Sequence, residues 1–466
     1  MKRLITIVLS ALSIVASAQT SKNVTVENVG ELSKKIEASE KFMISELKVS
    51  GPLNSADVKF LQQIVNRTKA NEKKDECLVT TVDISEVVFT NGKDATPTTT
   101  LPNSLFSGAK KLLKVVLPPN ISNISKSCFD GCESLPEVQI PESVTTIDNQ
   151  AFQGCESLVA ITIPQNVTTI GNEAFENCKA LSAIEIPENV TDLGNEAFNG
   201  CKSLATVNIR GKIKKINNST FKGCESLTGI TLPESLKSIG SDAFRDCKNL
   251  GSINLPDEID EIGNSAFEDC QSLTNIEMAN VSKIGSNAFE DCKNLSSVTL
   301  EKIIKLGSGV FKNCSSLGNV SIQGNINEIN SNTFFGCTNL SSISLPSSVK
   351  TIGNSAFEKC QSLGEFEFPS ALTKIGSEAF LGCTSLREAI IPNMVKSIGS
   401  SAFESCSQLD SVAIIGFIEE IDNKTFLKCN SLRRISLPAS IKKISTKAFQ
   451  ECTSLQSIDL PAALTS

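Results

Sequence analysis

The sequence predicts a solenoid built mainly of short parallel β-strands, and three observations support this fold class. The motif Phe-x-x-Cys-x-x-Leu occurs fifteen times, at intervals of 22 or 23 residues. Most copies continue with alternating apolar residues and a proline, and then place Gly, Asn or Asp at one further position. Self-similarity at a fixed period of about 20–50 residues indicates stacked repeats. We therefore expect any function to belong to a long repetitive surface.

The apolar positions of the motif predict a structural ladder through the core. An aromatic ring at one position of every coil should form a stacked spine, since equivalent side chains of successive coils lie above one another. An earlier, imperfect copy has Ala109 where the cysteine is expected, which brings the count to about sixteen repeats. Two neighbouring copies illustrate the ladder: Phe152, Cys155 and Leu158, then Phe175, Cys178 and Leu181.

Each repeat is expected to contain two short extended segments. The segment 158–163 ends in alternating β-branched residues, which favour a strand, and Pro164 should end it because proline cannot donate to a ladder. A second extended piece, 167–170, follows. The next position, Gly171 in this copy, is occupied by Gly, Asn or Asp in all copies but two. These residues tolerate positive φ, so we expect a left-handed turn at this position.

The repeated cysteines are expected to be buried free thiols. In-register coils place equivalent Cβ atoms about 4.8 Å apart, beyond the usual disulfide range, and cysteine packs well as a small apolar group. Disulfides between coils and metal binding remain open as alternatives. Cys77 and Cys128 lie off the ladder, and a bond between them also remains open.

Composition narrows the classes of function. The 466 residues carry a formal net charge of −7 and contain no His, Trp or Tyr. A mild acidic excess argues against nucleic acid, which requires a clustered basic face. The lack of histidine removes the commonest general base and metal ligand near neutral pH. We expect a protein that is not an enzyme, with no catalytic residues, no cofactor and no bound metal.

The chain divides into three regions. Residues 1–18 predict a secretory signal peptide, with Lys2 and Arg3, an apolar run and a small-x-small site, so that the mature chain begins at Gln19. No later stretch is long enough to cross a bilayer. Residues 19–100 predict an irregular α/β cap with degenerate repeat strands at 44–49 and 78–84 and a helix at 55–65. The repeats occupy 101–466.

The repeat pattern resembles a known family. Leu-x-x-Ile-x-Ile-Pro-x-x-Val-x-x-Ile-Gly-x-x-Ala-Phe-x-x-Cys, present over about 101–466, is similar to the BspA-like leucine-rich repeat proteins. The resemblance implies a leucine-rich repeat solenoid that is mostly β. Its parallel strands would line the concave face, with short extended or 3-10 segments on the convex side. It further implies a secreted or cell-surface protein that binds host matrix proteins, host cells or other microbes, and it supplies no catalytic residues.

Candidate binding residues lie at the outward positions of the concave strands. The acidic ones are Glu185, Glu277, Glu365, Glu367 and Glu388. The last three should lie on neighbouring coils beside Ile390. They form an acidic patch for a basic partner, a weak Ca²⁺ site or an ordinary solvated face. Most other outward residues are small and polar, which favours many weak contacts over one strong pocket.

Two further functions stay open beside protein binding and adhesion. Glycan binding is one, although sugars commonly stack on the Trp and Tyr rings that this chain lacks. A structural surface layer is the other. No polar cap is recognised after the last repeat, 460–466, so we expect either that the sequence is a truncated piece or that a partner covers its open strand edge, as in end-to-end self-association.

Overall fold

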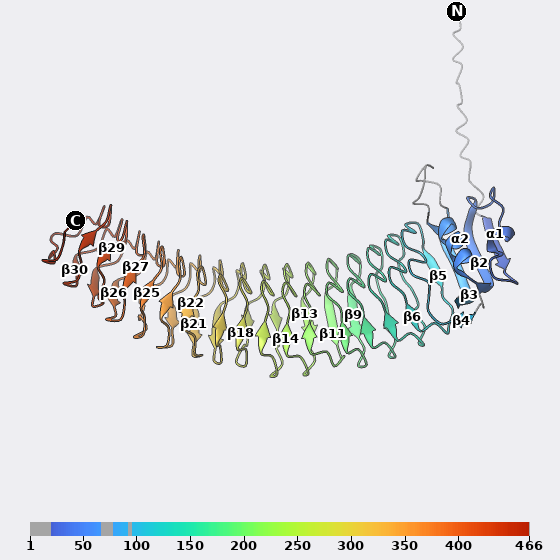
Figure 1. Cartoon of the computed structure of the whole chain (residues 1–466), viewed down its shortest axis with the longest axis horizontal. Helices are drawn as coiled ribbons and strands as arrows, with labels where there is room; N and C mark the ends of the chain where they lie inside the picture. The colour runs from blue at the N-terminus through green and yellow to red at the C-terminus, as the bar shows by residue number, and fades with distance from the viewer. Residues whose placement is uncertain (1–19, 67–77, 92–95, 466) are drawn as a thin grey trace, which may run out of the picture.

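The computed structural model describes residues 20–66, 78–91 and 96–465. Within these ranges the chain is a long, curved solenoid, in which one coil stacks on the next from the N-terminal sheet to the last repeat (Figure 1). The predicted signal peptide lies outside the described residues, as does Cys77.

The N-terminal region is a mixed sheet that continues into the solenoid. Its strands pair in the order β1-β2-β3-β4, and β5, which belongs to the first repeat, also pairs with β3. All of these pairs are parallel except β3–β4. The bounds are β1 Thr20–Thr25, α1 Leu32–Lys35, β2 Ile44–Leu53, α2 Ser55–Val65, β3 Thr81–Asn91, β4 Thr96–Thr98 and β5 Lys114–Val116. The predicted strands are therefore confirmed within β2 and β3.

The helix predicted at 55–65 is confirmed as α2, and its start has a clear cause. The Asn54 side chain accepts hydrogen bonds from the amides of Ala56 (2.9 Å) and Asp57 (3.2 Å). In return, the Asp57 carboxylate accepts the Asn54 amide at 3.0 Å. This reciprocal capping box satisfies amides that have no partner inside the helix.

A first ladder of parallel strands runs along the solenoid, one strand for most coils. Inward and outward side chains alternate along it, as the burial of β9 shows. After β5 the ladder comprises β9 Ala183–Ile186, β11 Thr206–Ile209, β13 Gly229–Thr231, β15 Ser252–Ile253, β17 Asn275–Ile276, β19 Ser297–Leu300, β21 Asn319–Ile322, β23 Ser342–Ser344, β26 Glu388–Ile391, β28 Ser411–Ile414 and β30 Arg434–Ser436.

A second ladder consists of two-residue strands that precede the Gly, Asn or Asp position. These strands also pair in parallel and in register, for example Thr169 with Thr146. They are β6 Asn123–Ile124, β7 Thr146–Ile147, β8 Thr169–Ile170, β10 Asp192–Leu193, β12 Lys215–Ile216, β14 Ser238–Ile239, β16 Glu261–Ile262, β18 Lys283–Ile284, β20 Lys305–Leu306, β22 Glu328–Ile329, β24 Thr351–Ile352, β25 Lys374–Ile375, β27 Ser397–Ile398, β29 Glu420–Ile421 and β31 Lys443–Ile444.

The rest of each coil is a run of turns that returns to the cysteine. Within a coil, the Cys155 amide donates to the Phe152 carbonyl at 3.2 Å. Between coils, the Phe152 amide donates to the Ala174 carbonyl at 2.7 Å. The turn side is therefore hydrogen-bonded within and between coils, which satisfies backbone groups that the core would otherwise leave without water.

The predicted phenylalanine spine is confirmed. The ring of Phe152 stacks on that of Phe175 with centroids 5.2 Å apart and planes inclined by 2°. Along the stack from Phe106 to Phe449, the centroid distance varies only between 5.0 and 5.6 Å. The ladder residues Phe152, Cys155, Leu158, Phe175, Cys178 and Leu181 are all fully buried. The predicted fold class, a parallel-strand leucine-rich repeat solenoid, is confirmed.

The predicted left-handed turn at the repeated glycine is wrong in its position. The residue with positive φ lies two places later, as at Glu173 (φ 56°), and a second one lies just before the cysteine, as at Asn177 (φ 57°). The glycine is needed for space. A Cβ atom on Gly285 would lie 2.5 Å from the Asn264 nitrogen and 2.6 Å from the Gly263 carbonyl carbon of the preceding coil.

Asparagines beside this glycine connect the coils, a role that sequence reasoning missed. The Asn149 side-chain oxygen accepts the Asn172 amide at 2.7 Å, and the Asn172 oxygen accepts the Asn195 amide at 2.8 Å. Asn264 accepts the Ser286 amide at 2.8 Å in the same way. The side chain of one coil thus provides the acceptor that the amide of the next coil requires.

Three coils depart from the pattern, and the second ladder is interrupted before each of them. Its pairing stops between β10 and β12, between β20 and β22, and between β27 and β29. Each of these coils lacks the proline, has Asn or Asp in place of the repeated glycine, and has a buried threonine before its phenylalanine. Their residues are Gly211, Asn217 and Thr220; Gly324, Asn330 and Thr333; and Gly416, Asp422 and Thr425.

We predict that Gly285→Ala destabilises the solenoid, because its Cβ would meet the backbone of the preceding coil. The expected loss is about 1–3 kcal/mol, the usual cost of overpacking. Urea or thermal unfolding followed by circular dichroism measures it. Gly229→Ala is the matched control, since a Cβ there would meet nothing within 4 Å. Equal effects of the two substitutions would contradict the steric explanation.

Candidate binding surface

The outward side chains of the first ladder form one surface, which we call the strand face. In β9, β19 and β26, exposed residues alternate with buried ones along the strand. The outward positions are mostly Ser, Thr, Asn, Ala and Glu. Such short side chains leave the strand face shallow and polar, so each coil can offer only a few weak contacts.

The five predicted acidic residues fall in different surroundings. Glu185 is exposed in β9 and pairs with Arg210, with 3.3 Å between carboxylate oxygen and guanidinium nitrogen. Glu277 is exposed just after β17, away from the others along the ladder. An exposed ion pair contributes little, so Glu185 is a solvated, partly neutralised position.

Glu365, Glu367 and Glu388 are brought together, as the sequence predicts. They line one hollow of about 620 Å³, into which Ile390 also projects. Sequence reasoning missed the two residues at its floor, Phe366 and Phe368. Their signal was available, because the other complete coils place Ile, Val, Leu, Met or Ala at these two inward positions.

The described residues give no support to a metal site at the acidic hollow. Across the described ranges, no group of three or more His, Cys, Asp or Glu side chains is arranged to hold a metal ion. No described helix is long and apolar enough to cross a membrane.

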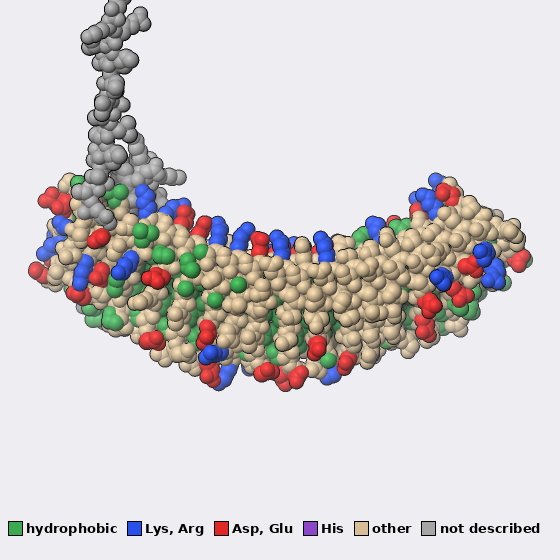
Figure 2. Space-filling model, turned by 180° about the vertical axis from the view of Figure 1, so that it is seen from behind, with side chains coloured by type: hydrophobic (Ala, Val, Ile, Leu, Met, Phe, Trp, Pro, Cys, Tyr) green, Lys and Arg blue, Asp and Glu red, His purple; other side chains and the backbone are tan. Residues whose placement is uncertain are grey.

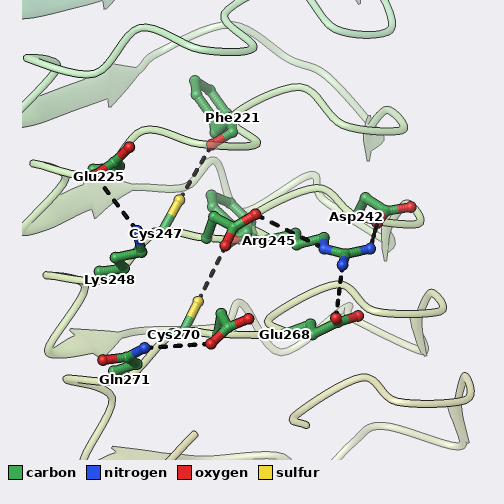
Figure 3. A network of polar contacts seen from close by, with 12 residues as sticks. Phe221, Glu225, Asp242, Arg245, Cys247, Lys248, Glu268, Cys270 and Gln271 are labelled. Atoms are coloured by element: carbon green, nitrogen blue, oxygen red, sulfur yellow. Dashed lines mark hydrogen bonds and ion pairs between the residues drawn. The ribbon is translucent and has the colours of Figure 1, made fainter. Parts of the chain in front are cut away.

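The predicted free thiols are confirmed for the repeat cysteines. Cys155 and Cys178 are buried and unbonded, and Cys452 in the last repeat is only partly buried. Each thiol donates to the carbonyl of the phenylalanine in the preceding coil, as Cys247 does to Phe221 at 3.2 Å (Figure 3). Cys128 is also a buried free thiol. The cysteine ladder is therefore part of the core up to its last, partly buried member.

Burial also changes the acidity of these thiols. Removal from water disfavours the thiolate and raises the pKa of Cys201 to about 12. The same cause raises the pKa of Cys178, Cys224 and Cys247 well above the ordinary value. The partly buried Cys452 thiol has its pKa raised to about 11. Protonated thiols of this kind are poor nucleophiles and poor metal ligands.

Charged side chains pair between coils in the turn segments around the phenylalanine and the cysteine. Arg245 contacts Asp242 at 3.2 Å within its coil and Glu268 of the next coil at 2.8 Å, and Lys248 contacts Glu225 at 3.6 Å (Figure 3). In the middle of the solenoid, the face seen in Figure 2 is mostly neutral, and its charged side chains gather along the concave and convex edges. The ion pairs of Arg245 and Lys248 are partly exposed, so each contributes little to the stability of the fold.

Comparison with known proteins places the chain in a family. The family model "BspA type Leucine rich repeat region (6 copies)" matches this chain over residues 99–228, 214–341, 304–432 and 350–466. The chain therefore belongs to the BspA-type leucine-rich repeat family. Among curated proteins, none matches this chain.

Two solved structures illustrate the similarity. A leucine-rich repeat protein from Bacteroides ovatus is 32% identical with a TM-score of 0.64, over 70% of this chain and 84% of that chain. A leucine-rich cell surface protein from Faecalibacterium prausnitzii is 28% identical with a TM-score of 0.41, over 79% of this chain and 84% of that chain.

We predict that the folded protein loses stability as the pH rises through about 9 to 12. Unfolded thiols ionise near pH 9, whereas the folded Cys201 thiol stays protonated to about 12. The free energy of unfolding is therefore unaffected by these thiols below pH 9, and it falls as the pH rises from 9 to about 12. Each such thiol removes about 1.4 kcal/mol of unfolding free energy per pH unit. Thermal unfolding at a series of pH values measures the slope.

The control for this prediction replaces four thiols by alanine, which Ala109 shows to be compatible with the same position in the first repeat. The variant Cys178→Ala, Cys201→Ala, Cys224→Ala, Cys247→Ala should show a shallower alkaline slope than the parent chain. An identical slope in the two proteins would contradict thiol ionisation as the cause of the alkaline loss.

Proposed function

We propose that this chain is a secreted or cell-surface protein that binds extracellular proteins through the strand face and acts in adhesion. The partners are host matrix proteins, host cell-surface proteins or surface proteins of other microbes. The observation that carries the proposal is the strand face itself, a continuous row of outward side chains on successive coils. Membership of the BspA-type family supports it.

The physical argument is one of repetition. The outward residues are small and polar, and the chain has no Trp or Tyr to serve as a strong anchor. An extended partner that touches several coils at once adds weak contacts into useful affinity, because each further contact becomes intramolecular. A curved solenoid presents its repeated contacts to one partner along its length (Figure 1).

We further propose that the chain is not an enzyme and works without a cofactor. The repeat pattern of the family contains no catalytic residues, and the chain has no histidine to serve as a base near neutral pH. The repeat thiols are buried and donate to backbone carbonyls, so they do not offer a nucleophile.

Export is checked on the natural protein. We expect mass spectrometry of the protein recovered from the culture medium or cell envelope to find an N-terminus at Gln19, because cleavage should follow Ala18. Recovery of an intact N-terminus from the cytoplasm alone would contradict the proposed localisation.

Binding is tested with purified residues 19–466 on immobilised matrix glycoproteins, with a polysaccharide panel alongside and a series of salt concentrations. We expect saturable binding to at least one matrix protein that weakens with salt, since the contacts are polar and exposed. Signal on polysaccharides alone would favour glycan binding. Silence on both, together with concentration-dependent light scattering, would favour a self-associating surface layer.

A further inference from the structure

The first ladder opens around one coil without an assigned strand, between β23 and β26; its pairing is also interrupted before β9, between β13 and β15 and between β17 and β19. Among the described residues, no backbone hydrogen bond joins 365–368 to either neighbouring coil, and the last contact before the opening is from the Arg387 amide to the Gly364 carbonyl at 3.2 Å. The opening is local. On the other side of the same coils, β24, β25 and β27 pair in register, and the Phe357 and Phe380 rings stack at 5.2 Å.

Two aromatic side chains lie at this opening. Phe366 and Phe368 occupy the two inward positions of this coil and are 9% and 8% exposed. Phe366 packs edge-on against Phe357 and Phe380, with centroids 5.1 and 4.9 Å away. Phenylalanine is larger than the isoleucine or leucine that most coils have at these positions. Ala389, at the aligned position of the next coil, leaves room for the larger ring.

The resulting hollow has an apolar floor and an acidic rim. Its volume is about 620 Å³, and Phe366, Phe368 and Pro392 contribute to its lining. Ile390, 51% exposed, adds an apolar side chain to the rim.

Charge distinguishes this hollow from the rest of the strand face. Glu365, Glu367 and Glu388 are exposed, and within the described ranges no cation forms an ion pair with any of them. Glu388 accepts only a hydrogen bond from the Ser411 hydroxyl at 3.2 Å. Arg387 is the single cation of the lining. Three carboxylates against one guanidinium leave two negative charges beside an apolar floor.

We propose that this hollow binds an extended, lysine- or arginine-containing segment of a partner protein. The aliphatic part of the cationic side chain packs against Ile390 and the two phenylalanines, and its charge lies among Glu365, Glu367 and Glu388. The inference rests on the proposed function and names the chemistry of the partner.

A second opening in the first ladder serves as an internal comparison. There, a hollow of about 870 Å³ is lined by residues of the coils at 114–119, 137–142 and 160–164. Its lining has Val138 and Ile140 but no aromatic residue, and Lys114 stands among its carboxylates. Its two glutamates and one lysine leave one negative charge instead of two, and its floor lacks the aromatic rings.

The test uses two fluorescent peptides with residues 19–466. The first is Gly-Val-Lys-Val-Arg-Val-Gly, and the second has glutamate in place of both cations. We expect anisotropy to show binding of the cationic peptide only, weakening with salt. The variant Glu365→Gln, Glu367→Gln, Glu388→Gln should weaken it by about tenfold or more, since it removes three unpaired charges from one site. Glu277→Gln, on the same face, is the matched control and should change nothing.

A second variant removes the hollow but keeps the charges. Phe366→Ile, Phe368→Leu, Ala389→Ile restores residues that other coils use, so the ladder should close with the core still filled. Circular dichroism and protection of the buried cysteines from a thiol reagent establish that it folds. Loss of peptide binding in this folded variant supports the site, whereas undiminished binding overturns it.

Other outcomes also decide the matter. Equal binding of both peptides, or no effect of the glutamine variant, overturns the inference. If CaCl₂ alone binds and this binding requires the three glutamates, while neither peptide binds, the hollow is a cation site and the inference is overturned. Retained binding to an immobilised matrix protein by the glutamine variant would overturn the role of this hollow while leaving the proposed function intact.

Discussion

The in-register stacking of one coil on the next is the constraint on which the whole structure depends. It brings the Phe152 amide to the Ala174 carbonyl at 2.7 Å and the Phe152 ring to the Phe175 ring at 5.2 Å. An isolated coil has neither interaction, because its hydrogen-bonding groups and its ring faces point at its neighbours. Stability therefore belongs to the array, as expected for a quasi-one-dimensional fold.

This constraint also explains the small residues of the repeat. Alanine, glycine and cysteine stand where successive coils approach most closely. A Cβ on Gly285 would meet the preceding backbone, and the Cys247 thiol fills a buried position while donating to Phe221 of the preceding coil. A thiol in this position is small, apolar and protonated. Its chemistry is that of a core residue, which accounts for a long row of cysteines that carries no reactive site.

Where the stacking is regular, the surface is uniform, and where it is interrupted, the surface acquires distinct features. The second ladder breaks before three coils that share a glycine, an Asn or Asp and a buried threonine. The first ladder is open at the coil of Phe366 and Phe368, and an acidic hollow lies there. In a repeat protein, such departures from the pattern are the places where one coil can be distinguished from another by a partner.

The sequence by itself determined the solenoid, the length of its repeat, the aromatic spine and the buried thiols, because a periodic pattern repeats the same local choice many times. It also indicated that Glu365, Glu367 and Glu388 are neighbours. Only the tertiary structure decided why the repeated glycine is needed, since the approach of Gly285 to Asn264 is a contact between coils. It also decided that Phe366 and Phe368 line a hollow beside the three glutamates, because the space around a side chain is set by the coils on either side and not by its own segment.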